Sequence, residues 1–164
     1  MSDIFRLGGI LLITLSAYLV SRGYSAFLDR RESETEGFFD LLLHIERELG
    51  LSLSSGRELW RGFENEALCK SGLLPLLKEG VELPSAFAEC RKRLMVSAEC
   101  EKILLRFFSD FGRDYKDGEL KRIAMAKEEL SKLLCEEKTE NKKNKRVVGA
   151  IAFGFAASAA ILLI

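Results

Sequence analysis

The stretch KKNKRVVGAIAFGFAASAAILLI, residues 142–164, decides which class of fold this sequence can adopt. A basic cluster from Lys142 to Arg146 precedes eighteen residues, Val147 to Ile164, that carry no charge. Eighteen helical residues rise about 27 Å, close to the roughly 30 Å hydrocarbon core of a bilayer. The pattern therefore predicts a C-terminal membrane helix over residues 147–164.

Small residues recur within this predicted membrane helix. A four-residue spacing places small side chains on one helical face, through the set Gly149, Ala152, Ala156 and Ala160. Such a face lets another membrane helix approach closely, so these residues are candidates for membrane helix packing. The alternative is that the alanines only fill a weakly hydrophobic span, and the pattern does not decide between the two.

A second apolar segment, LGGILLITLSAYLVS, occupies residues 7–21 between Arg6 and Arg22. Fifteen helical residues rise about 22 Å, which is short of a full crossing unless the flanking arginines snorkel or the bilayer thins. A cleaved signal peptide is disfavoured, because Asp3 opposes Arg6 and no small-x-small cleavage site follows. The segment predicts a second membrane helix, and whether it spans the bilayer fully stays open.

The basic residues near these segments predict an orientation. Arg22, Arg30, Arg31 and the cluster from residue 142 to 146 lie toward the middle of the chain, and only Arg6 lies beyond the apolar segment. The positive-inside rule then places the middle of the chain in the cytoplasm and both ends across the membrane. The basic cluster could in addition touch anionic lipid headgroups.

The composition favours a helical protein, and the net charge is zero. The 164 residues are 48% hydrophobic and 30% charged, with equal numbers of acidic and basic residues, so a nucleic-acid binder is disfavoured. Only two prolines occur, which favours long helices. We predict an all-α protein in three parts: an N-terminal membrane helix with a juxtamembrane stretch (1–28), a cytoplasmic helical bundle (29–146) and the C-terminal membrane helix (147–164).

Apolar residues at three- and four-residue spacing mark the helices of the bundle. The first predicted helix runs from Phe38 to Leu49 and ends at Gly50, and the second carries Leu59 to Phe63 after capping-box spacing at Ser55–Glu58. A third helix begins at Pro84, and a fourth runs from Cys100 to Phe111 and is closed by Gly112. The last helix is capped by Asp117 and can continue into the membrane span. The phenylalanine stripe before Gly112 has helical spacing, which favours core packing over a ligand pocket. Lys127 falls within the apolar stripe of the last helix, so either its stem snorkels or that stretch meets a partner.

Candidate chemistry is sparse. The sequence has four cysteines, Cys69, Cys90, Cys100 and Cys135, which form no CxxC pair, and only one histidine. We therefore expect no metal and no cofactor. Cys90 and Cys100 are expected to be core residues. Zinc would need scattered cysteines to converge.

Asp40, His44 and Glu48 are four residues apart and share a helical face, which resembles half a catalytic or metal site. A solvated polar face with pairing between turns explains the same spacing and is favoured. Because HExxH, GxSxG and a Gly-rich phosphate loop are all missing from the sequence, we do not expect an enzyme.

The stretch FGRDYKDGELKRIAMAKEEL, residues 111–130, resembles the stage III sporulation protein AB family of endospore-forming bacteria. The family pattern there runs leucine, glycine, arginine or serine, acidic, two variable residues, glycine and glutamine. Its places are taken by Gly112, Arg113, Asp114, Asp117 and Gly118, with Glu119 where glutamine is usual and the spacing loosened by one residue. The layout of apolar ends around a helical middle also agrees.

This resemblance implies a function. In that family the cytoplasmic helical domain is similar to platform proteins of type II secretion and lies in the mother cell. It implies a non-catalytic scaffold in the outer forespore membrane, in an oligomeric channel-like complex between mother cell and forespore that includes a secretion-type ATPase. The turn from Gly112 to Glu119 would be a candidate partner contact, although pure helix capping explains the same residues equally well.

Two other readings remain. A tail-anchored groove protein that binds partner helices also has an all-helical domain and a C-terminal span, but this chain has an N-terminal apolar segment. The Asn-Trp-Gly-Arg stretch of such proteins is missing, and LWRGFE at residues 59–64 does not replace it. A membrane-tethered enzyme using His44 is the other reading.

Overall fold

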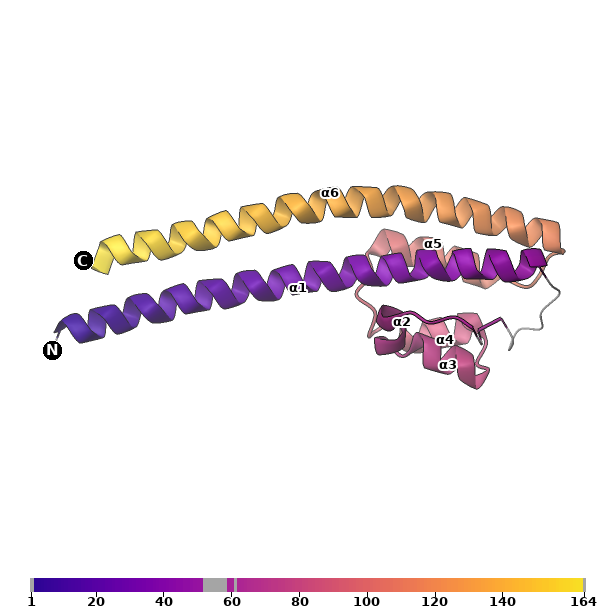
Figure 1. The fold of residues 1–164 in the computed structure, drawn as a ribbon, viewed down its shortest axis with the longest axis horizontal. Coiled ribbons are helices and arrows are strands. Elements are labelled where there is room, and N and C mark those ends of the chain that lie inside the picture. Colours follow the sequence, from indigo (N-terminus) through magenta and orange to yellow (C-terminus); the bar gives the residue numbers. More distant parts are fainter. Residues whose placement is uncertain (1, 52–58, 61, 164) are drawn as a thin grey trace. The chain divides into compact units, whose positions relative to one another are not determined.

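The computed structural model describes residues 2–51, 59–60 and 62–163. This part of the chain forms helices and no strand, which confirms an all-helical protein (Figure 1). The helices are α1 (Ser2–Leu51), α2 (Glu66–Lys70), α3 (Leu73–Glu79), α4 (Leu83–Cys90), α5 (Ala98–Asp110) and α6 (Lys116–Leu163). The chain divides into two compact units, which we call the two-helix unit (Met1–Asp29 with Lys138–Ile164) and the bundle unit (Arg30–Glu137).

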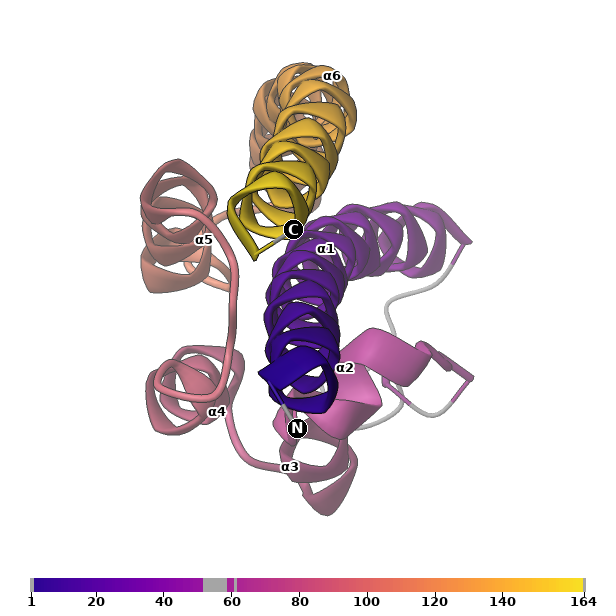
Figure 2. The ribbon, with the colours of Figure 1, turned by 90° about the vertical axis from the view of Figure 1, so that its left-hand side faces the viewer.

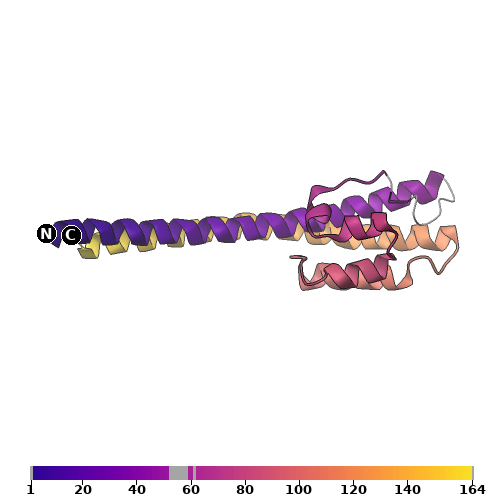
Figure 3. The ribbon, with the colours of Figure 1, turned by 90° about the horizontal axis from the view of Figure 1, so that it is seen from below.

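The two-helix unit contains the N-terminal part of α1 and the C-terminal part of α6. The two segments run antiparallel, with both chain ends at the same end of this unit (Figure 1, Figure 3). An ion pair between Asp29 and Lys145 joins them. Large apolar side chains point outward from both segments and include Leu11, Leu12, Tyr18, Leu19, Val20, Ile151, Phe153 and Phe155. Apolar surface of this kind is suited to lipid rather than to water.

Among the described residues, α1 alone is long and apolar enough to cross a membrane by length and composition. This agrees with the predicted apolar helix near the N-terminus. The segment from residue 147 to 163 is helical as part of α6, and its crossing of a membrane stays a prediction.

The core of the bundle unit is built around three phenylalanines. Phe38 of α1, Phe87 of α4 and Phe108 of α5 are each at most 1% exposed. The Phe87 ring lies 5.8 Å from the Phe38 ring and 5.0 Å from the Phe108 ring, both edge to face. Figure 2 shows α4 and α5 on the same side of α1, as these contacts require. The phenylalanine stripe therefore packs the core, as its helical spacing predicted.

The predicted helix over Leu59 to Phe63 is wrong for its described residues. Leu59 and Trp60 lie in a turn and Phe63 lies in a segment without regular secondary structure, yet all three are buried. Burial of three large apolar side chains fixes this segment without helical hydrogen bonds. The capping-box residues Ser55–Glu58 lie outside the described residues.

The prediction of a solvated His44 is also wrong, because the side chain is only 7% exposed. Its Nε2 lies 2.7 Å from the Leu59 carbonyl oxygen, and its Nδ1 lies 2.9 Å from a guanidinium nitrogen of Arg47. A carbonyl can only accept and a guanidinium can only donate, so Nε2 carries the hydrogen and Nδ1 accepts. His44 thus anchors the Leu59 turn to α1, with its ring 5.1 Å from that of Phe63.

Two further sequence questions are resolved in the bundle unit. Lys127 of α6 pairs with Glu46 of α1, so its charge is met within the chain. Cys90 and Cys100 are fully buried, which confirms their core role, whereas Cys69 and Cys135 are exposed. Burial raises the pKa of the Cys100 thiol to about 12, because the thiolate is poorly solvated there.

A candidate partner-binding turn

The turn between α5 and α6 contains the residues that carried the family resemblance. The amphipathic α5 ends at Asp110, and Phe111 has extended backbone angles. Gly112 then adopts a φ of 83°, in the left-handed region that a side chain with a Cβ disfavours. The backbone therefore requires glycine at the point where the chain reverses.

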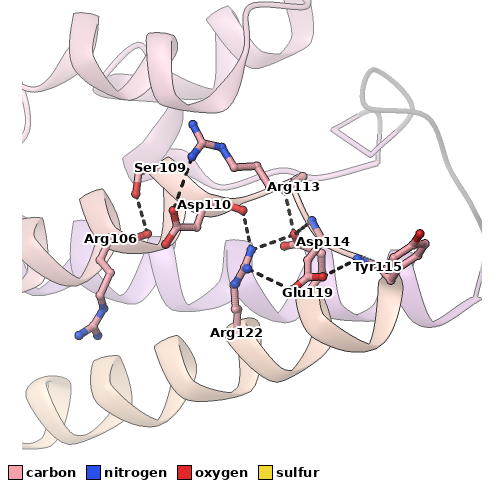
Figure 4. A network of polar contacts seen from close by, with 9 residues as sticks. Arg106, Ser109, Asp110, Arg113, Asp114, Tyr115, Glu119 and Arg122 are labelled. Carbon is pink, nitrogen blue, oxygen red and sulfur yellow. Dashed lines mark hydrogen bonds and ion pairs between the residues drawn. The ribbon is translucent and has the colours of Figure 1, made fainter.

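Glu119 of α6 holds this turn from inside. Its Oε1 accepts hydrogen bonds from the backbone N–H groups of Gly112 and Asp114, both at 3.1 Å, and from Arg122 at 3.2 Å (Figure 4). The residue is 4% exposed, so these bonds are shielded from water. One carboxylate oxygen thus satisfies two backbone donors that the tight turn leaves without a helical partner.

Arg122 binds the same turn from the next turn of α6. Its guanidinium donates to the Asp110 carbonyl oxygen at 2.6 Å and to the Asp114 carboxylate at 3.1 Å, as well as to Glu119. The Asp110 carbonyl belongs to the end of α5, where a cation is favoured by the unpaired carbonyl groups. Arg122 therefore clamps the end of α5 to the start of α6 (Figure 4).

Gly118 is needed because Asp114 packs against it. A Cβ at position 118 would lie 2.5 Å from the Asp114 carboxylate oxygen Oδ2, too close for any real contact. The other oxygen of Asp114 accepts a hydrogen bond from the Tyr115 backbone at 3.0 Å. Asp117 does not cap α6 as predicted, because the helix begins one residue earlier, at Lys116. Asp117 lies exposed in the first turn, where a negative charge interacts favourably with the helix dipole.

Other side chains of the turn face solvent. The Arg113 side chain is 75% exposed and is 4.0 Å from the Asp110 carboxylate, while Tyr115 is 89% exposed. Arg113 also borders a cavity of about 430 Å³, which is lined mainly by Trp60, Gly80, Val81, Leu83, Pro84, Phe108 and Phe111. The turn therefore presents a charged side chain beside an apolar hollow.

The candidate residues of the predicted membrane helix are placed unevenly. Ala152 and Ala156 are half-buried, Gly149 is exposed, and the Ala160 side chain lies outside the described part of the chain. Their role in membrane helix packing stays a prediction.

The sequence did not single out Arg122, although it organises the turn. The one available signal was its three-residue spacing from Glu119, which is common on helix surfaces. In chemical terms the turn has hydrogen-bond donors, acceptors and charges held in fixed places. Within the described residues, no three His, Cys, Asp or Glu side chains come together as metal ligands would.

Comparison with known proteins identifies one family. The family model described as stage III sporulation protein AB matches residues 6–164, which is almost the whole chain. No curated protein and no solved structure matches the chain significantly.

Proposed function

The chain belongs to the stage III sporulation protein AB family, and from this premise we propose that it is a membrane-anchored, non-catalytic scaffold of a sporulation channel complex. Family membership supports a role in sporulation. The finer proposal is that the bundle unit docks a secretion-type ATPase and other components of a secretion-like complex between mother cell and forespore.

The anchoring part of the proposal draws support from the two-helix unit. α1 is apolar enough to cross a membrane, and the segment from residue 147 onward continues α6 as a helix with exposed Ile151, Phe153 and Phe155. We propose that both helices lie in the outer forespore membrane, with the bundle unit in the mother-cell cytoplasm, because the basic residues gather toward that unit.

One observation carries the docking part: the turn between α5 and α6 is fixed from inside by Glu119 and Arg122 while Arg113 faces solvent. Preorganised surface charges lose little entropy when a partner binds. Arg113, Asp114 and Asp117 are the exposed candidates, and Gly112, Gly118 and Glu119 give the turn its shape. The neighbouring cavity has room for an apolar side chain of the partner.

A scaffold role without catalysis is also compatible with His44. Both of its ring nitrogens are already hydrogen-bonded within the protein, to Leu59 and Arg47. A general base or metal ligand needs a free nitrogen. The proposed scaffold uses no cofactor.

Co-purification with the ATPase from sporulating cells tests docking. Arg113→Glu reverses the exposed charge and is expected to lower recovery of the ATPase about tenfold, within the range found for interface charges. Lys92→Glu makes the same charge change at an exposed position after α4, which lines none of the cavities described here, and should leave recovery unchanged. Far-UV circular dichroism of both variants checks the fold. Equal recovery with wild type and Arg113→Glu would refute docking at this turn.

A second candidate function is binding of a partner helix in a groove. Two cavities of about 310 and 270 Å³ lie along α5 and α6 and share Ile103 and Arg106. Arg106 forms an ion pair with Glu129 across the same seam, so a bound helix would have to displace it. If this function holds, Ile103→Arg abolishes partner recovery while Arg113→Glu does not.

A further inference from the structure

Three cations in the two-helix unit form no ion pair with any described part of the chain. Lys142, Lys143 and Arg146 of α6 are exposed, and within the described residues none of them forms an ion pair. At about 100° per residue they share the side of α6 that faces away from the buried Asn141. Lys145 differs, because it is half-buried and pairs with Asp29.

The same side of α6 becomes apolar immediately afterwards. Phe153 follows Arg146 by seven residues, which is two helical turns, and its side chain is 76% exposed. Two turns rise about 10 Å, so a helix with Phe153 among acyl chains places Arg146 near the headgroups. The unpaired cations and the exposed apolar side chains are therefore parts of one continuous helix surface.

We propose that Lys142, Lys143 and Arg146 form a binding surface for the headgroups of anionic phospholipids. This inference rests on the proposed membrane anchoring and adds a lipid preference to it. A headgroup phosphate is the complementary anion that is present at this depth, directly next to the hydrocarbon that covers Phe153. An acidic segment of another protein would have to reach the same depth to compete.

The expected size of the effect follows from surface electrostatics. Each Lys or Arg near a membrane surface favours an anionic lipid roughly fivefold at low ionic strength. Because dissolved ions screen these exposed charges, we expect their joint removal to lower the preference only about tenfold. Added salt should weaken the preference in the wild-type protein.

The test uses the full chain reconstituted in vesicles of phosphatidylglycerol and phosphatidylcholine. Electron paramagnetic resonance of spin-labelled lipids measures the association constant of each lipid with the protein surface. The wild-type protein should prefer phosphatidylglycerol, and the variant with Gln at positions 142, 143 and 146 should lose about tenfold of this preference. Glutamine has a helix propensity close to that of Lys and Arg, so the helix should persist, which circular dichroism checks.

A matched control removes the same charge elsewhere. Gln at Lys102, Lys121 and Lys132, all exposed in the bundle unit, should keep the wild-type lipid preference. Loss of preference in this control would refute a headgroup surface on α6, and so would a larger loss with inorganic phosphate than with sodium chloride at the same ionic strength. So would equal association of both lipids with the wild-type protein. Flotation of the same vesicles separates this failure from a failure of anchoring, in which the protein would not float.

Discussion

Arg31 and Glu137 join α1 to α6 through two hydrogen bonds to one carboxylate oxygen, with Nε at 3.2 Å and a terminal nitrogen at 3.0 Å. Glu137 is 5% exposed and the Arg31 side chain is 31% exposed, so the carboxylate of this pair is shielded from water. Its partners are 106 positions apart in the sequence. The pair therefore fixes the pairing of the two long helices within the bundle unit.

Glu137→Ala should destabilise the protein. It leaves a half-buried guanidinium without its carboxylate, at a cost of about 2 kcal/mol after allowing for the partial exposure of Arg31. Thermal unfolding of the full chain in detergent, followed by circular dichroism, measures the effect. Glu128→Ala on the same helix removes an exposed pair with Lys132 and should leave the melting temperature almost unchanged. Similar melting of the two variants would contradict the role of the Arg31 pair.

Gly118→Ala should destabilise the protein even though alanine is the better helix former by about 1 kcal/mol. The reason is the Asp114 carboxylate, which occupies the space that the new Cβ needs. In an Asp114→Ala background the two closest atoms, Oδ2 and Cγ, are removed and only Cβ remains at 3.2 Å, so the same Gly118→Ala change should cost much less. Melting temperatures of the four combinations give the coupling between the two sites. Additive effects would show that Asp114 does not restrict position 118.

The four cysteines should differ in their reaction with a thiol reagent. Cys69 and Cys135 are exposed and should be alkylated in the folded protein at pH 8, as mass spectrometry of peptides would show. Cys90 and Cys100 are buried, and with a pKa of about 12 only about one Cys100 in ten thousand is a thiolate at pH 8. Unfolding in urea should make all four reactive. Native labelling of Cys100 at the rate of Cys69 would contradict the packing of α5.

His44→Ala should lower the free energy of unfolding by about 2 kcal/mol, because the buried Leu59 carbonyl loses its donor and Arg47 loses its acceptor. The matched control is Asp40→Ala, one turn earlier on α1 at an exposed position, with an expected change below about 0.5 kcal/mol. Chemical denaturation of the two variants compares them directly. Equal stability of His44→Ala and the wild type would return His44 to the solvent-exposed face.

The helices and much of the core could be predicted because apolar spacing reflects burial directly. Phe38 and Phe108 were each placed on an apolar face by their spacing and do meet in the core. The length of α1 could not be predicted in the same way, whereas the last helix was expected to be able to continue into the membrane span, as α6 does. Changes of composition near residues 28 and 146 suggested separate parts, but a helix continues wherever no proline or cap interrupts it, whatever surrounds its side chains.

The polar contacts were predicted least well, because they depend on residues that are distant in the sequence. His44 was misplaced since its partner Leu59 lies in a non-helical segment fifteen residues away. Gly112 was found from helix-stop chemistry, which is local, whereas Gly118 was singled out only by the family resemblance. Arg122 was missed because it binds the backbone carbonyl of Asp110. Every residue has such a carbonyl, so residue types do not indicate which one accepts a hydrogen bond.

The hydrogen bonds of Glu119 bear on the pattern expected from the family resemblance, which has glutamine at this place. Only Oε1 receives hydrogen bonds, and Oε2 is buried without a partner. A side-chain amide offers an equivalent oxygen at the same distance from the backbone. In Glu119→Gln the chain reversal should therefore persist while the turn loses one negative charge.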